Sequence, residues 1–156
     1  RVNAIALTHS MLYNNQNPNL VNAKSYLTEL IKEIQLSEQG EGKEFDAEIT
    51  PLDIQIDFDQ AVCLGIITNE LITNSLKHAK PKKDQLKISL DLRMDNEKAL
   101  YTYRDNGASL KEKDSKHSMG LRLIEIALKR IGGDKRDAEI GQNPFACSFS
   151  FLPNNK

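Results

Sequence analysis

Hydrophobic residues near the start of the chain recur at helical spacing. They predict a short helix over residues 2–13, because the run then meets Asn-Asn-Gln-Asn-Pro, a sequence that breaks helices. A second helix is predicted after the N-cap residue Asn22, with a buried face formed by Ala23, Leu27, Leu30, Ile31 and Ile34. The polar, glycine-containing segment 37–44 then predicts a joint to the rest of the chain.

From residue 45 the apolar positions alternate instead. This predicts a strand over residues 45–57, or a bent pair of strands, because Pro51 interrupts the alternation. Asp57 follows as an N-cap, with Gln60 in the position that completes a capping box. The pattern therefore predicts a long, largely apolar helix that runs to about Ala79.

The remaining segments predict one more helix and several strands. Alternating runs over 86–94 and 99–104, joined by Asp-Asn-Glu-Lys, are typical of a β-hairpin. A charged loop leads to a helix over 118–131 that stops at two glycines, and strands are predicted near 135–140 and 146–152. The order of elements indicates a mixed α/β layer structure.

Composition limits the size and compartment of this structure. The chain has 156 residues, enough for one compact domain with a modest appendage. Its 21 basic and 22 acidic residues nearly cancel, which argues against nucleic acid as a partner. Cys63 and Cys147 lie in apolar stretches without metal-ligand spacing, so we expect reduced core thiols and a cytoplasmic location. Because the chain starts at Arg1 within a helical pattern, we expect a piece of a longer protein, whose anchoring in a membrane stays open.

The predicted long helix carries a polar stripe. Glu70, Asn74 and Lys77 lie at i, i+4 and i+7, so they share one face of the helix. Together they offer a carboxylate, an amide oxygen able to ligate a hard cation, and an ammonium able to meet a phosphate. Taken alone, the same trio also fits an ordinary exposed helix face.

Two further segments carry candidate chemistry. Asp105, Asn106 and Gly107 follow a predicted strand, where a carboxylate can accept a hydrogen bond and a glycine allows a flat ring to approach. The same triplet is also a common turn. Ser118 and Gly120 open the next helix, whose free N–H groups could hold an anion, although Ser is also an ordinary N-cap.

The order of these segments resembles a known family. Three segments resemble the ATP-binding catalytic domain of sensor histidine kinases: a helix with E-L-I-T-N-S-L-K-H-A, a hairpin leading to D-N-G, and then S-M-G-L-R-L-I. That domain belongs to the superfamily of gyrase, a heat-shock chaperone and the mismatch-repair ATPases. The stretch A-L-T-H-S-M-L-Y, followed by a Y-L-x-x-L-I helix, resembles the end of the pairing module of one subfamily.

The resemblance implies a fold and a division of the chain. It implies a two-layer α/β sandwich of the Bergerat type, with a mixed, mainly antiparallel sheet covered by helices on one face and an N-terminal helical segment before it. Residues 1–38 would be the remnant of a helical dimerisation and phosphotransfer module. Residues 39–156 would be the ATP-binding catalytic domain.

The resemblance also implies roles for four residues of the long helix. Asn74 would be the ligand of Mg²⁺, and Glu70 would be the catalytic acidic residue near the metal and the γ-phosphate. Lys77 and His78 would be neighbours of the phosphates.

Other implied contacts with the nucleotide come from the later segments. Asp105 would accept a hydrogen bond from the adenine amine, and Gly107 would line the base pocket. Ser118 and Gly120 would lie at the phosphates, and Leu121 would add to the apolar wall of the pocket.

The implied activity is transfer of the γ-phosphate of Mg-ATP to a histidine on an upstream helix that is not part of this chain. The chain alone is therefore expected to be inactive, and His9 to be a packing residue. The implied partners are ATP, the acceptor helix, a response regulator and a second copy of the parent protein.

Departures from the family pattern keep alternatives open. Ser109 and Ser118 stand where glycines are frequent in the family. A degenerate nucleotide-binding or scaffold domain is therefore one alternative, and a related serine kinase or ATPase is another.

Overall fold

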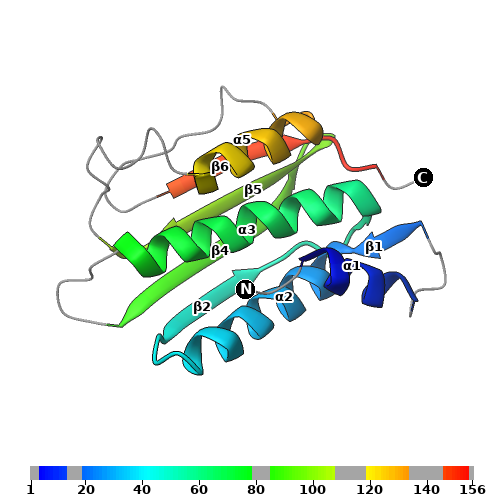
Figure 1. Cartoon of the computed structure of the whole chain (residues 1–156). Coiled ribbons are helices and arrows are strands. Elements are labelled where there is room, and N and C mark those ends of the chain that lie inside the picture. The colour runs from blue at the N-terminus through cyan, green and yellow to red at the C-terminus, as the bar shows by residue number, and fades with distance from the viewer. Residues whose placement is uncertain (1–3, 14–18, 79–84, 108–118, 134–145, 155–156) are drawn as a thin grey trace.

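The computed structural model describes residues 4–13, 19–78, 85–107, 119–133 and 146–154. Four helices lie in these ranges: α1 (Ala4–Tyr13), α2 (Ala23–Gln39), α3 (Phe58–His78) and α5 (Met119–Arg130). The strands are β1 (Leu20–Asn22), β2 (Phe45–Thr50), β3 (Gln55–Asp57), β4 (Leu86–Asp95), β5 (Lys98–Asp105) and β6 (Ala146–Phe151). Figure 1 shows the helices packed against a twisted sheet.

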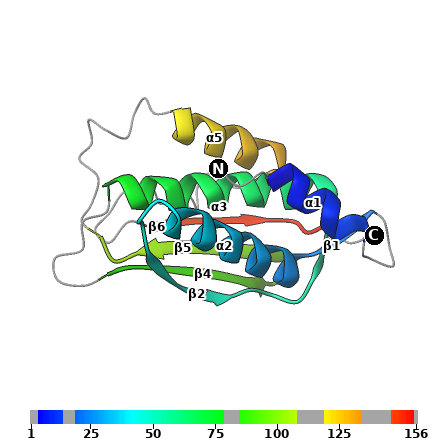
Figure 2. The same cartoon turned by 60° about the horizontal axis from the view of Figure 1, so that its bottom comes forward.

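The main sheet has the strand order β2-β4-β5-β6. β2 pairs with β4 in parallel, whereas the β4–β5 and β5–β6 pairs are antiparallel. Figure 2 shows α3 and α5 on one side of this sheet. The described residues thus form two layers with a mixed, mainly antiparallel sheet, which confirms the predicted fold class.

Alternation along the strands decides which side chains enter the core. Along most of β4 and β5 every second residue is buried beneath the helices, and aromatic residues of β6 extend the same layer. The larger members of this layer are Leu86, Ile88, Leu90, Leu92, Tyr101, Tyr103, Phe149 and Phe151. The aliphatic face of α3 meets them through Leu64, Ile67, Leu71 and Ile72. The opposite face of the sheet carries polar side chains, because no layer covers it among the described residues.

The N-terminal helical part is built into this core. Asn22 caps α2 by accepting a hydrogen bond from the Ser25 N–H at 2.9 Å, and all five apolar residues predicted for the buried face are buried. α2 packs against α3 and β2, and the short strand β1 pairs with β3. α2 runs on to Gln39, so the joint is shorter than predicted and turns at Gly42, whose φ is 77°. The division of the chain after residue 38 stays a prediction.

The predicted bent strand pair is two strands in two different sheets. β2 joins the main sheet next to β4, whereas β3 joins the small sheet with β1. Pro51 lies between them, and proline cannot continue a ladder of backbone hydrogen bonds. The alternation predicted the strands correctly, but it holds no information about their partners.

Other predicted elements are confirmed where they are described. The β4–β5 hairpin turns at Asn96 and Glu97, and Asn96 has a φ of 58°, a left-handed conformation that Asn tolerates better than most residues. α5 is followed by Gly132, whose φ is 68°. The predicted strand near 135–140 and the charged loop before Ser118 lie outside the described residues. In the part of the chain that is described, none of the helices has the length and apolar character needed to span a membrane.

Both cysteines are free thiols in the core, as predicted. Burial raises the pKa of Cys63, and it raises the pKa of Cys147 to about 11. Both side chains are therefore neutral at physiological pH and pack as small apolar groups.

The start of α3 is held by the predicted capping box. The Gln60 N–H donates to Asp57 Oδ1 at 2.7 Å, and the Asp57 N–H donates to Gln60 Oε1 at 3.3 Å. The buried Gln60 amide also holds the chain after β6, since it donates to the Leu152 carbonyl at 2.7 Å and accepts from the Asn154 N–H at 2.8 Å. One side chain thus joins the N-terminus of α3 to the C-terminal tail.

We expect Gln60→Ala to lower the free energy of unfolding by about 2 kcal/mol, because it leaves three partly buried backbone groups without their partner. Urea denaturation followed by circular dichroism measures this loss. Gln39→Ala, at an exposed position near the end of α2, is the matched control and should change stability little. Equal stability of the two variants would contradict the structural role of Gln60.

Candidate functional site

The last residue of β5 carries a buried carboxylate. Asp105 is 4% exposed, and its Oδ2 accepts a hydrogen bond from Ser75 Oγ of α3 at 2.6 Å. Its Oδ1 accepts from the Gly107 N–H at 2.9 Å. The structure therefore brings the predicted residues Asp105 and Gly107 together and joins them to α3 through Ser75.

Asn106 secures this corner. Its Oδ1 accepts from the Lys87 N–H at 2.8 Å, its Nδ2 donates to the Gln85 carbonyl at 3.2 Å, and its own N–H donates to the Lys87 carbonyl at 3.2 Å. These bonds continue the pairing to β4 beyond the last residue of β5. The Asp105–Asn106–Gly107 triplet thus forms a tight corner that hydrogen bonds fix to β4, and it fixes the orientation of the Asp105 carboxylate.

The three side chains of the polar stripe on α3 differ in their exposure to solvent. Glu70 is 5% exposed, Asn74 is partly buried, and Lys77 is exposed. An ordinary surface helix face would leave all three side chains in water, so that interpretation does not fit Glu70. The helix instead carries these groups from the interior out to the surface near its C-terminal end.

The start of α5 lies toward the same end of the molecule. Arg130, at the end of α5, contacts Asp59, at the start of α3, with an N–O distance of 3.5 Å. The two helices are therefore antiparallel, and Figures 1 and 2 both show the start of α5 near the C-terminal half of α3. Gly120 and Leu121 lie in the first turn of α5, where backbone N–H groups lack partners within the helix.

Some predicted site residues are described only in part. His78 is the last residue of α3, and its side chain lies outside the described part of the chain, as do the side chain of Leu121 and the whole of Ser118. The structure thus brings Asp105 and Gly107 together at the end of β5 and places Glu70, Asn74 and Lys77 on α3, the helix that Ser75 joins to this corner.

Sequence reasoning missed two residues of this corner, Ser75 and Tyr103. Tyr103 OH lies 2.5 Å from Ser75 Oγ, inside the core. The available signal was the position of Ser75, which is in phase with the buried residues Ile67 and Leu71 at i−8 and i−4. A polar residue in the apolar phase of a helix needs a buried partner, which a sequence does not name.

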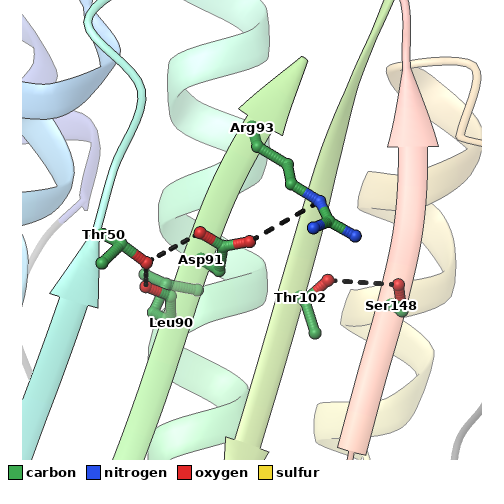
Figure 3. Close-up of polar contacts among 6 residues, drawn as sticks. All are labelled: Thr50, Leu90, Asp91, Arg93, Thr102 and Ser148. Atoms are coloured by element: carbon green, nitrogen blue, oxygen red, sulfur yellow. Dashed lines mark hydrogen bonds and ion pairs between the residues drawn. The ribbon is translucent and has the colours of Figure 1, made fainter. Parts of the chain in front are cut away.

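The open face of the sheet holds a hollow of about 380 Å³. Residues of β2, β4 and β5 line it, including Asp46, Glu48, Lys87, Ser89 and Arg104. Farther along this face the polar side chains satisfy one another: Thr50 donates to Asp91 at 2.7 Å, Arg93 pairs with Asp91 at 3.9 Å, and Thr102 and Ser148 lie 3.4 Å apart, as Figure 3 shows. Asp105 and Asn106 also line this hollow, so it reaches the corner at the end of β5, where the Asp105 carboxylate bonds to Ser75 of α3.

Known proteins resemble this chain both in sequence and in fold. Residues 1–38 match a family model described as histidine kinase. No curated protein sequence matches the chain. Among solved structures, the histidine kinase domain of a blue-light activated histidine kinase from Erythrobacter litoralis aligns with a TM-score of 0.73 and 15% identity, over 98% of this chain and 76% of that one. Residues 1–38 thus carry the similarity to the histidine kinase family, and the described residues share the fold of histidine kinase domains.

Further solved structures share the fold of this chain. A longer chain of the Erythrobacter litoralis kinase aligns with a TM-score of 0.76 and 15% identity, over 96% of this chain but 46% of that one. The Acinetobacter baumannii histidine kinase AdeS aligns with a TM-score of 0.63 and 14% identity, over 97% of this chain and 76% of that one. The predicted fold is therefore confirmed, and the predicted family agrees with the model that residues 1–38 match.

Proposed function

We propose that the site at the end of β5 binds the base of ATP, and that the α3 stripe holds its phosphates for transfer to a histidine. The observation that carries this proposal is the buried Asp105 carboxylate, held beside Gly107 by bonds to both of its oxygens. A carboxylate fixed in this way at the end of a strand is suited to accept a hydrogen bond from an amino group of a ligand.

In this proposal the α3 stripe serves the phosphate end of the nucleotide. Asn74 supplies a partly buried amide oxygen, and Glu70 supplies a carboxylate one helical turn earlier, so both fit the oxygen ligands that Mg²⁺ prefers. When bound, Mg²⁺ neutralises charge on the β- and γ-phosphates. Lys77 and His78 are the proposed cationic and polar neighbours of the phosphates, and the first turn of α5 at Gly120 offers N–H groups to them.

The phosphoacceptor is proposed to be a histidine on a helix outside this chain, and a response regulator and a second copy of the parent protein are the proposed partners. His9 does not suit the role. Its ring contacts Phe58 at the start of α3 with ring centroids 5.0 Å apart, and Phe58 lies sixteen residues before Asn74, or about 24 Å along the helix axis.

We therefore expect the chain to bind labelled Mg-ATP without acquiring acid-labile phosphate on His9. Mass spectrometry after incubation with Mg-ATP measures this. A longer chain that carries the acceptor helix is the positive control, because it supplies a histidine at near-attack distance. Phosphate recovered on His9 would contradict the proposed separation of donor and acceptor.

Titration of the chain with ATP, with and without Mg²⁺, tests the proposed function itself. Isothermal titration calorimetry should give saturable binding that Mg²⁺ strengthens. Absence of saturation at millimolar ATP would instead support the scaffold alternative. Transfer of phosphate to serine in a full-length protein would support the serine kinase alternative.

A further inference from the structure

We propose that Ser75 and Tyr103 are positioning residues for base recognition: they form a buried hydroxyl relay that orients the Asp105 carboxylate and so makes the site select a base with an amino group. This inference rests on the proposed role of Asp105 in binding the base. It adds two residues to the site, one from α3 and one from β5.

The three side chains form a continuous chain of hydrogen bonds inside the protein. Ser75 Oγ lies 2.6 Å from Asp105 Oδ2, and Tyr103 OH lies 2.5 Å from Ser75 Oγ. Ser75 is 3% exposed and Tyr103 is fully buried, so water does not compete for these bonds. Tyr103 OH also lies 3.3 Å from the Leu71 carbonyl, a second and more distant acceptor for its single proton.

Proton counting decides the direction of the relay. An ionised carboxylate only accepts hydrogen bonds, so the single hydroxyl proton of Ser75 goes to Asp105. Ser75 Oγ is then the acceptor for the proton of Tyr103. Burial raises the pKa of Tyr103 well above its ordinary value, which keeps the phenol protonated and able to donate.

This arrangement controls which hydrogen bonds Asp105 can make with a ligand. Ser75 donates to one carboxylate oxygen and the Gly107 N–H donates to the other, so the plane of the carboxylate is held from two sides. A carboxylate has about four acceptor positions, and the remaining ones can serve a donor such as the amino group of adenine. A base with a carbonyl at the same place would bring oxygen against oxygen and be rejected.

The core contains a matched pair that does not reach Asp105. Tyr101 lies two residues before Tyr103 on β5, and its OH lies 2.8 Å from Thr68 Oγ1 of α3. Both residues are fully buried, so this pair links the same strand to the same helix by the same kind of bond. Removing a hydroxyl here should cost similar stability without changing Asp105.

The experiment compares the affinities of the whole chain for ATP, for inosine triphosphate and for purine riboside triphosphate, which has no group at the amino position. Ser75→Ala and Tyr103→Phe are the test variants, and Thr68→Val and Tyr101→Phe are their controls. We expect the preference for ATP over purine riboside triphosphate to fall about tenfold in Ser75→Ala and several-fold in Tyr103→Phe. The control variants should keep the wild-type preference, and Ser75→Thr, which retains a hydroxyl, should restore much of it.

The outcomes separate this inference from the proposed function. If Asp105→Ala loses ATP while Ser75→Ala and Tyr103→Phe keep the wild-type preference, the relay is overturned and the proposed function stands. A loss of preference that is equal in the test and control variants also overturns the relay, because general destabilisation would then explain it. If the wild-type chain does not bind ATP at all, both are wrong.

Discussion

Asp105→Ala is expected to weaken ATP binding by roughly 10- to 100-fold while the protein remains folded. The variant removes the acceptor proposed for the adenine amine, and a hydrogen bond to a charged group contributes about 1.5 to 3 kcal/mol, with each 1.4 kcal/mol worth a factor of ten. The neighbouring contacts favour an effect of this size. The carboxylate is preoriented by Ser75 and Gly107, so a ligand need not order it on binding.

Calorimetry with ATP measures the change, and thermal unfolding verifies that the variant is folded. Asp105→Asn is a second variant, because it keeps the shape of the side chain while replacing one acceptor oxygen by a donor. Asp91→Ala is the control: Asp91 lies on the open face of the sheet, where it contacts Thr50 and Arg93 (Figure 3). An unchanged dissociation constant in Asp105→Ala would exclude this residue from base recognition.

Asn74→Ala is expected to remove the Mg²⁺-dependent part of ATP binding and to leave adenosine binding intact. Mutating even an outer partner of a metal ligand costs about 10- to 100-fold in metal affinity, so loss of a direct ligand should cost at least about tenfold. The effect should be confined to the metal because Asn74 lies on the α3 stripe, whereas the base site is formed at the end of β5 by Asp105.

The measurement is the ratio of ATP affinities with Mg²⁺ and with a chelator. In Asn74→Ala this ratio should approach one. Asn69→Ala is a matched control, since it removes the same side chain from a partly buried position on another face of the same helix. Binding of Mg-ATP by Asn74→Ala at the wild-type level would rule out Asn74 as the ligand.

If both predictions hold, base recognition and metal binding are separable functions of two elements, β5 and α3. The relay through Ser75 would then be the physical link between them, because it joins the helix that carries Asn74 to the strand that carries Asp105. A variant of Ser75 would affect the base without changing the metal ratio. This pattern distinguishes a positioning role from a general loss of structure.

Local patterns in the sequence were sufficient to predict most of the helices and strands and the positions of several of their ends. The capping box of Asp57 and Gln60 and the cap at Asn22 depend on residues within three positions of each other, so the sequence contains both partners. The spacing of Glu70, Asn74 and Lys77 likewise determines that they share one helix face, because the helical period alone sets their directions.

Only the tertiary structure decided which strands pair and which distant side chains contact one another. The alternation over residues 45–57 did not reveal that β2 and β3 belong to different sheets, because each strand pairs with a segment far away in the chain. β1 has only three residues, too few for a period to show. The same holds for Ser75, Tyr103 and Asp105: residues about 30 positions apart along the chain meet only when α3 packs on the sheet, and this contact turns an ordinary Asp-Asn-Gly corner into a preoriented carboxylate.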